Sequence, residues 1–323
     1  MARAQDFTAR IPVEYTEACD LDRSDVAARV IARNEEVYPR LVAQTSNGWL
    51  VHDRYEQQVV ELDQDLRKVH NWGQHGPGPM EYESPVGLGR LDSARVVVVD
   101  GNPPSLIVFG PGGSEHRLAI LARPTHAIVA DGRILIATSE ATVHEVTVDG
   151  QLRTVNTRDD FGLAENSGRG ATPAPRLRQG HMAFTGPSAI WRLGVEPQQV
   201  IQRCVHDDLL GMLEEAIRID TPFGAHPFNL TTMQDFLPLG TRGFLTLGGL
   251  VVRVDMGREF QNLRSIEHYD SRGRLTQAWQ LTGYPAARGV FDKHVVGRML
   301  IWNEDEIEGI QLVEVEELVA VHR

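Results

Sequence analysis

The stretch RVVVVD, residues 95–100, decides how this chain folds. Four consecutive valines between charged residues are typical of a short strand that is buried on both faces. Similar apolar runs open at Trp49, Val96, Ile134, Ile190, Phe244 and Met299. Their spacing of roughly 50 residues is the period of a β-propeller, in which each blade is one four-stranded antiparallel sheet. We therefore predict an all-β, six-bladed β-propeller that occupies residues 1–323 as a single domain.

Turn signals agree with this periodicity. The dipeptides Asp131–Gly132 and Asp149–Gly150 each lie between β-rich runs, and Asn47–Gly48 precedes the run at Trp49. Asn-Gly and Asp-Gly are favoured by the two-residue turns of β-hairpins. The pattern therefore predicts antiparallel strands joined by short hairpins.

One segment in the second half departs from the repeat. Residues 207–219 carry Leu209, Leu213 and Ile217 at helical spacing, and Asp207 is a residue type that caps the start of helices. We expect one short helix inserted between two blades here.

The sixth predicted blade lacks an outer strand, whereas apolar residues at 11–15 and 28–31 precede the first blade. We expect a segment within residues 8–31 to supply the missing strand and close the propeller. Such a closure hides a sheet edge that would otherwise pair with other chains.

Charge and composition narrow the range of partners. The formal net charge is -12 at pH 7, which argues against binding nucleic acid or anionic lipid by bulk attraction, because both require clustered Lys and Arg.

No window approaches the roughly 18 apolar residues of a membrane span, and residues 1–10 contain no apolar signal region. We expect a soluble monomer, cytoplasmic as the sequence stands, or periplasmic or secreted if a signal peptide has been removed. Cys19 and Cys204 leave a disulfide open.

The segment WGQHGPGPMEY, residues 72–82, followed by an apolar strand that ends at Asp100, resembles bacterial six-bladed propellers of the NHL-like and TolB-like type. Many of those proteins carry a G-x-G-P-G-E-F stretch between their first two blades. The blade endings at residues 148–150 and 269–275 resemble the turns of the same proteins. The resemblance implies the propeller fold. It leaves the activity open among protein-binding scaffolds, ligand sensors, lactonases and strictosidine-synthase-like enzymes.

The Gly76–Pro77–Gly78 stretch has the glycines of a phosphate-binding loop. However, its prolines remove backbone donors and no helix follows it, so we interpret it as a rigid turn between blades. The sequence also contains no G-x-S-x-G, H-E-x-x-H or EF-hand motif.

Propeller geometry indicates where a site would lie. The loops that join the second and third strands of each blade, and those that join successive blades, emerge on the same face around the central channel. The residues that we expect there to bind a ligand are Asp53, Arg54, Tyr55, His75, Asp100, His126, His181, His226 and Arg253. We expect each of the four histidines to begin or to precede an inner strand and thus to be able to point into the channel.

We expect the protein to bind a peptide, a protein or a small molecule at this face without a cofactor. The alternative is an enzyme at the channel mouth, either a lactonase-like hydrolase or a strictosidine-synthase-like condensing enzyme. Lactonase-like propellers hold a divalent cation on the channel axis, which by resemblance would be Ca²⁺ or Zn²⁺ on Asp53, Glu81, Asp100 and Asn102. Asp53 and Asp100 could equally cap their own hairpins.

Overall fold

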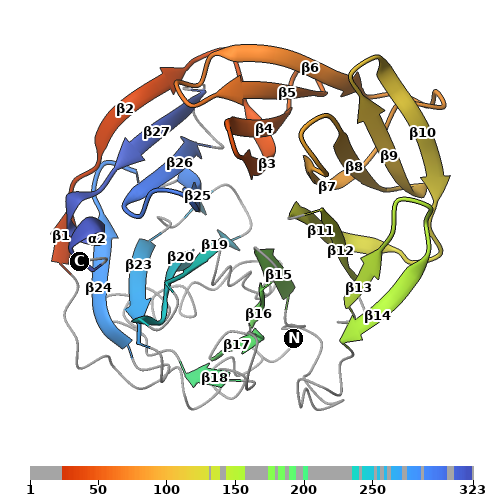
Figure 1. The fold of residues 1–323 in the computed structure, drawn as a ribbon. Coiled ribbons are helices and arrows are strands. Elements are labelled where there is room, and N and C mark those ends of the chain that lie inside the picture. Colours follow the sequence, from red (N-terminus) through yellow and green to blue (C-terminus); the bar gives the residue numbers. More distant parts are fainter. Residues whose placement is uncertain are drawn as a thin grey trace, which may run out of the picture.

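The computed structural model describes residues 24–130, 132–138, 143–156, 174–178, 181–185, 189–193, 199–202, 235–239, 242–250, 253–254, 258–259, 263–270, 275–284, 287–303 and 309–321. In these ranges the strands pair into five four-stranded sheets, one five-stranded sheet and one two-stranded sheet. The larger sheets lie around a ring with one strand of each nearest the centre (Figure 1). This is the β-propeller fold that the repeated apolar runs predict.

Sheets 1 to 3 are each built from consecutive strands. Sheet 1 contains β3 (Pro39–Thr45), β4 (Gly48–Asp53), β5 (Gln58–Asp63) and β6 (Lys68–Gln74). Sheet 2 contains β7 (Pro85–Arg90), β8 (Val96–Gly101), β9 (Pro104–Gly110) and β10 (Gly113–Ala119). Sheet 3 contains β11 (Pro124–Ala130), β12 (Arg133–Thr138), β13 (Val143–Val146) and β14 (Leu152–Asn156).

Sheets 4 to 6 complete the ring. Sheet 4 contains β15 (Ala174–Arg178), β16 (His181–Thr185), β17 (Ala189–Leu193) and β18 (Gln199–Gln202). Sheet 5 contains β19 (Asp235–Pro238), β20 (Phe244–Leu250), β23 (Leu263–Tyr269), β24 (Leu275–Leu281) and β1 (Ser24–Val26). Sheet 6 contains β25 (Ala287–Phe291), β26 (Arg298–Asn303), β27 (Ile310–Glu314) and β2 (Arg29–Asn34). The short strands β21 (Arg253–Val254) and β22 (Arg258–Glu259) pair with each other between β20 and β23.

The N-terminal segment closes the ring, as the sequence predicts. Strand β2 pairs antiparallel with β27 and forms the outer strand of sheet 6, with Arg29 opposite Glu314 and Asn34 opposite Ile310. Strand β1 also pairs in parallel with β24 of sheet 5, which the sequence did not predict. The segment therefore covers the edges of two neighbouring sheets (Figure 1).

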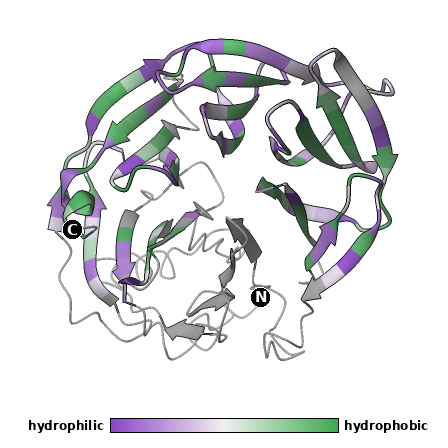
Figure 2. Cartoon of the chain, in the orientation of Figure 1, coloured by the Kyte–Doolittle hydropathy of each residue, from purple (hydrophilic) through white to green (hydrophobic). Residues whose placement is uncertain are grey.

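The apolar runs form the contacts between sheets. Val97 is 0 % exposed and Ile134 is 1 % exposed, and both belong to one apolar cluster that joins sheets 2 and 3. This confirms the strand register expected for these two runs. Figure 2 shows that hydrophobic residues concentrate on β8 and β9, whereas the outer strands β2 and β6 mix polar and apolar residues.

Glycines let the innermost strands approach one another. A Cβ atom at Gly89 in β7 would lie only 2.6 Å from the carbonyl oxygen of Val129 in β11, and one at Gly87 would overlap the backbone of Ala127. Blades converge toward the axis of a propeller, so the innermost strands have the least room for side chains.

The structure corrects the expected strand assignments of sheets 2 and 4. Sheet 4 begins with β15, so His181 starts the second strand of its sheet and not an inner strand. The inner strand β7 was also missed, because its alternating glycines do not resemble a strand.

The expected helix at 207–219 lies outside the described residues, as do Cys19 and Cys204. A helix that the sequence did not predict, α2 (Glu316–Ala320), instead packs Leu318 into the apolar cluster of sheets 5 and 6. In the described part of the chain no helix is long and apolar enough to cross a membrane.

Candidate functional site

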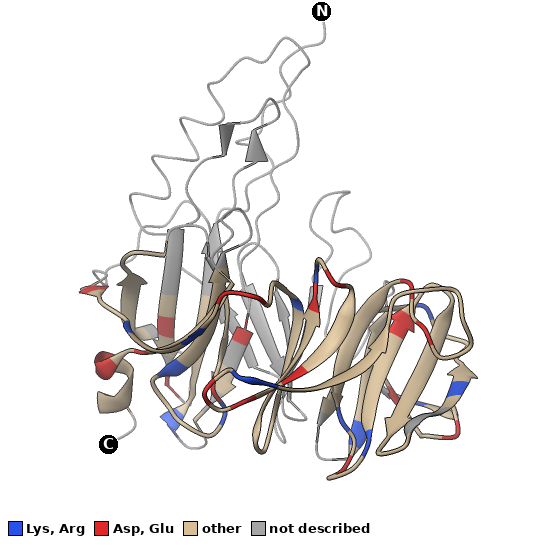
Figure 3. Ribbon diagram, turned by 90° about the horizontal axis from the view of Figure 1, so that it is seen from above, with Lys and Arg blue, Asp and Glu red and all other residues tan. Residues whose placement is uncertain are grey.

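One end of the sheets carries most of the predicted site residues whose side chains are described. At this end the second strand of each sheet turns into the third, and each sheet connects to the next; we call it the loop face. Figure 3 shows that many of the Asp, Glu, Lys and Arg residues lie at strand ends and in loops. The described members of the predicted set at the loop face are Asp53, Arg54, Tyr55, His75, Asp100 and His126.

Asp53 is a structural residue of this face. It ends β4 and is 1 % exposed. One carboxylate oxygen accepts hydrogen bonds from the backbone N–H groups of Tyr55 (2.8 Å) and Glu56 (2.9 Å), and the other accepts from Tyr38 (3.1 Å). A buried carboxylate with three such donors is fully satisfied by the protein. Asp53 thus fixes the loop after β4 and ties it to the chain that enters β3.

Asp100 does the same in sheet 2. It is 0 % exposed and accepts hydrogen bonds from the backbone N–H groups of Ser84 (2.8 Å) and Glu83 (2.9 Å), which lead into β7. The guanidinium of Arg117 lies 3.4 Å from the same carboxylate and donates to the carbonyl oxygen of Glu81 at 2.9 Å. Asp100 and Arg117 therefore clamp the connection between sheets 1 and 2. Asp53 thus caps its own hairpin as interpreted, whereas Asp100 mainly caps the segment that leads into β7.

The Gly-rich connection is a rigid turn. The carboxylate of Glu81 accepts hydrogen bonds from the N–H of Gly78 and the side-chain amide of Gln74, each at 2.8 Å. These bonds hold the pKa of Glu81 below its usual range, with the Gln74 bond contributing most. A Cβ atom at Gly78 would lie 2.8 Å from this carboxylate, so the glycine leaves room for Glu81 to fold back into the turn. Glu81 is therefore an internal partner of the loop.

A buried histidine lies directly beneath this connection, and the sequence did not single it out as a site residue. His52 is 2 % exposed, and neither of its ring nitrogens has a hydrogen-bond partner among the described residues. Its ring packs edge-to-face on Tyr82, with centroids 5.5 Å apart. Burial lowers the pKa of His52 to about 4, and the positive charges of Arg40 and His75 act in the same direction, whereas Asp53 opposes them. His52 is therefore neutral at physiological pH.

Tyr82 completes this buried layer. It is 0 % exposed, and its hydroxyl donates to the carbonyl oxygen of Gln57 at 3.3 Å, while burial raises its pKa. The same carbonyl accepts the N–H of His75 at 2.9 Å. Gln57 itself has a φ of 52°, an uncommon conformation for a side-chain-bearing residue. The loop after β4 and the connection after β6 are thus bonded into one unit.

Polar and aromatic side chains are exposed above this unit. Tyr55 is 62 % exposed and packs edge-to-face on Tyr38, with ring centroids 4.7 Å apart. Arg54 and His75 are also exposed. Arg40 is exposed on the innermost strand, at the position where β3 slips its register against β4. We call Arg40, Arg54, Tyr55 and His75 the sheet 1 rim.

The sheet 1 rim contains no other predicted histidine among the residues that the structure describes. His126 is half-buried in β11 of sheet 3. His181 pairs with Arg178 at the hairpin between β15 and β16, which is the end opposite the loop face, so its placement on the loop face was wrong. The backbone of Arg253 lies in the β21–β22 hairpin, and His226 lies outside the described residues.

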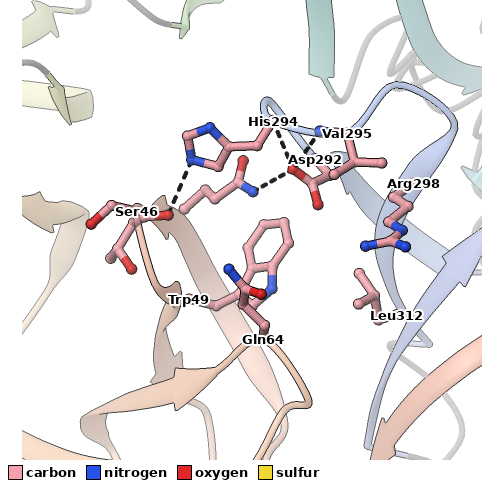
Figure 4. Close-up of a pocket in the computed structure, with 11 residues that line it drawn as sticks. Ser46, Trp49, Gln64, Asp292, His294, Val295, Arg298 and Leu312 are labelled. Carbon is pink, nitrogen blue, oxygen red and sulfur yellow. Dashed lines mark hydrogen bonds between the residues drawn. The ribbon is translucent and has the colours of Figure 1, made fainter.

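A small pocket lies at the opposite end of the molecule, between sheets 1 and 6 (Figure 4). Its volume is about 60 Å³, which suits a few water molecules but no organic ligand. Across it the side chain of Gln44 donates to Asp292 and accepts from the N–H of Lys293, each at 2.6 Å. Because Gln44 and Asp292 belong to the first and last sheets, these bonds join the ends of the ring.

Three of the residues considered as ligands of a channel-axis cation have hydrogen-bond partners within the protein. The carboxylate oxygens of Asp53, Glu81 and Asp100 accept hydrogen bonds from backbone and side-chain donors of the protein. Across the described ranges, no three residues among His, Cys, Asp and Glu come together as ligands. The geometry instead provides a rigid surface with exposed cations and an aromatic ring.

Comparison with known proteins adds information on the fold. No protein-family model matches the chain, and no curated protein matches its sequence. Among solved structures, the chain is similar to a protein from Bacteroides fragilis that is described as an exported protein, with 11% sequence identity and a TM-score of 0.53. The similarity covers 93% of this chain and 97% of that chain.

The chain is also similar to hydrazine synthase from Kuenenia stuttgartiensis, at 10% identity, with 95% of this chain and 80% of that chain covered and a TM-score of 0.50. BamB from Moraxella catarrhalis has 10% identity, 88% and 99% coverage and a TM-score of 0.42. At such low identities, the structural similarity to the exported protein and to hydrazine synthase shows the fold alone and assigns no ligand.

Proposed function

We propose that this protein binds a peptide or a small-molecule ligand through its loop face, at the sheet 1 rim. The observation that carries the proposal is the rigid base under the rim. Asp53 anchors the loop that carries Arg54 and Tyr55. The carbonyl oxygen of Gln57, which also accepts the Tyr82 hydroxyl, holds the backbone N–H of His75. A prearranged backbone beneath exposed side chains reduces the conformational freedom that is lost when a partner binds.

The residue types of the rim support binding. Tyr and Arg are enriched among residues that dominate interface energies, because they combine apolar contact area with hydrogen-bond donors. Tyr55 remains 62 % exposed although it rests against Tyr38. An aromatic ring presented in this way can contact a partner without being rearranged.

The proposal is tested with the full chain on an array of short random peptides. Arg54→Ala, Tyr55→Ala and His75→Ala should each weaken the binding of retained peptides while leaving the melting curve unchanged. The matched controls are Arg95→Ala at the opposite end and Val69→Ala on the outer strand β6, since Val69 is also 62 % exposed. Equal losses in the control and rim variants would refute a site at the rim.

We further propose that the protein works as a single-domain, six-bladed propeller of the NHL-like or TolB-like type, monomeric and without a metal or cofactor. The six large sheets and the closure by β2 support the blade count. The use of Asp53 and Asp100 as hydrogen-bond acceptors supports binding without a metal. Peptide binding that disappears in a chelator and returns with Ca²⁺ or Zn²⁺ would refute the last point.

A further inference from the structure

Among the arginines that the structure describes, two groups differ in their partners. One group forms ion pairs with carboxylates, and it includes Arg29, Arg33, Arg67, Arg90, Arg95, Arg117, Arg133, Arg153 and Arg298. Three others, Arg40, Arg54 and Arg123, pair with no carboxylate of the described residues. In a chain with a net charge of -12, a guanidinium without an acidic partner is unexpected.

All three of these arginines lie at the loop face. Arg40 is the second residue of β3, Arg54 follows β4 directly, and Arg123 directly precedes β11. All three side chains are exposed. The backbone of Arg54 is held by a 2.7 Å hydrogen bond from its N–H to the carbonyl oxygen of Tyr38. The cations are therefore presented from fixed positions on sheets 1 and 3.

Among the described residues, two acids near these arginines have other partners. Glu56 bonds to Gln58 and lies 3.8 Å from Lys68, and Glu81 is folded into its own loop. Glu36 and Glu83 are exposed on the neighbouring connections, and among the described residues neither forms an ion pair with these arginines. Local charge on an acidic protein suits a short segment with spaced carboxylates better than a polyanion such as nucleic acid.

Exposed apolar side chains accompany the unpaired arginines. Tyr55 adjoins Arg54, and Leu121 lies two residues before Arg123 with 98 % of its surface exposed. A leucine so exposed in water contributes nothing to the core, and apolar contacts beside charged ones are the composition of a binding surface.

We infer that the partner of the loop face is an acidic peptide segment that also carries apolar side chains. This inference rests on the proposed function above and specifies its ligand. Carboxylates of the segment pair with Arg54, Arg123 and Arg40, since guanidinium and carboxylate form strong paired hydrogen bonds. Apolar residues of the segment pack on Tyr55 and Leu121.

The test uses three matched peptide arrays and the full chain. The first array combines Asp and Glu with Leu and Phe, the second replaces the acids by Asn and Gln, and the third replaces the apolar residues by Ser. We expect binding on the first array only, weakened by added salt because exposed charge pairs are screened. The double variant Arg54→Gln, Arg123→Gln should lose at least about tenfold in affinity, since a hydrogen bond to a charged group contributes about 1.5–3 kcal/mol.

The control double variant is Arg95→Gln, Arg133→Gln, which removes two arginines from the opposite end and should leave affinity unchanged. Melting curves establish that all variants fold. If the neutral array binds equally well and Tyr55→Ala still weakens it, the acidic partner is wrong and the loop-face site stands. If no array retains the protein, or no loop-face variant changes binding, both proposals are overturned.

Discussion

Replacement of His52 by leucine tests the most unusual buried group of the protein. The ring is 2 % exposed, lacks a described partner at both nitrogens and packs on Tyr82. Leucine has a similar size and no polar atoms. Because an unsatisfied buried polar group costs about 1–3 kcal/mol, His52→Leu should be as stable as the natural protein or more stable at neutral pH.

The pH dependence gives the sharper measurement. Folding lowers the pKa of His52 from 6.5 to about 4. When the pH falls below 6.5, the unfolded chain therefore takes up a proton at His52 before the folded chain does, and the natural protein loses stability. The loss is complete near pH 4 and amounts to about 3 kcal/mol, because each pKa unit corresponds to about 1.4 kcal/mol. The leucine variant has no imidazole at position 52, so its unfolding free energy should not fall by this amount at low pH.

The assay is urea unfolding of both proteins from neutral pH to about pH 4 at constant ionic strength. The difference in unfolding free energy between variant and natural protein cancels the effects of the other histidines, and should grow in favour of the variant as the pH falls. His70→Leu, which removes an exposed histidine from the same sheet, is the matched control. A difference for His52→Leu that stays constant over this range would show that folding does not lower the pKa of His52, and would refute the reasoning.

Three further predictions concern the frame of the site. Asp100→Ala should lower the free energy of unfolding in urea by about 3–5 kcal/mol, because the backbone N–H groups and the guanidinium that bond to Asp100 would lose their partner. A loss under about 1 kcal/mol would disprove the clamp. Gly89→Ala should lower the melting temperature because its Cβ would lie 2.6 Å from a backbone oxygen, whereas Gly112→Ala, with no atom within 4 Å, should be neutral; equal shifts would contradict the close approach of β7 and β11. Deletion of residues 1–30 removes β1 and the start of β2, and should lower the melting temperature and increase light scattering, so an unchanged protein would rule out the closure.

The sequence by itself determined the repeat and most of its strands. Runs such as Val96–Val99 are apolar and β-branched over a length that only a buried strand accommodates, and Asp-Gly pairs locate the turns. These signals are local, because a strand and its hairpin partner lie within a few residues of each other. The N-terminal closure was also predictable, because one blade lacked a strand and a strand-like segment remained.

Only the tertiary structure decided which polar residues are buried supports of the loops and which are exposed. Asp53 and Asp100 look like ligand-binding residues in the sequence, but their donors come from chain segments 15 to 17 residues away as well as from their own loops. His181 lies at the end opposite the predicted one, because an additional strand, β15, precedes it in sheet 4. The glycines of β7 are strand residues only because a neighbouring sheet leaves no space for a side chain there.

The same holds for the arginines of the loop face. Arg54 and Arg117 are alike in the sequence, yet Arg117 pairs with Asp100, 17 residues earlier in the chain, and Arg54 pairs with no described acid. Whether a charge is neutralised depends on which carboxylate the fold brings within a few ångströms, and a linear sequence does not contain that distance. The sequence thus determined the propeller, and the packing of its sheets decided which charges remain available to a partner.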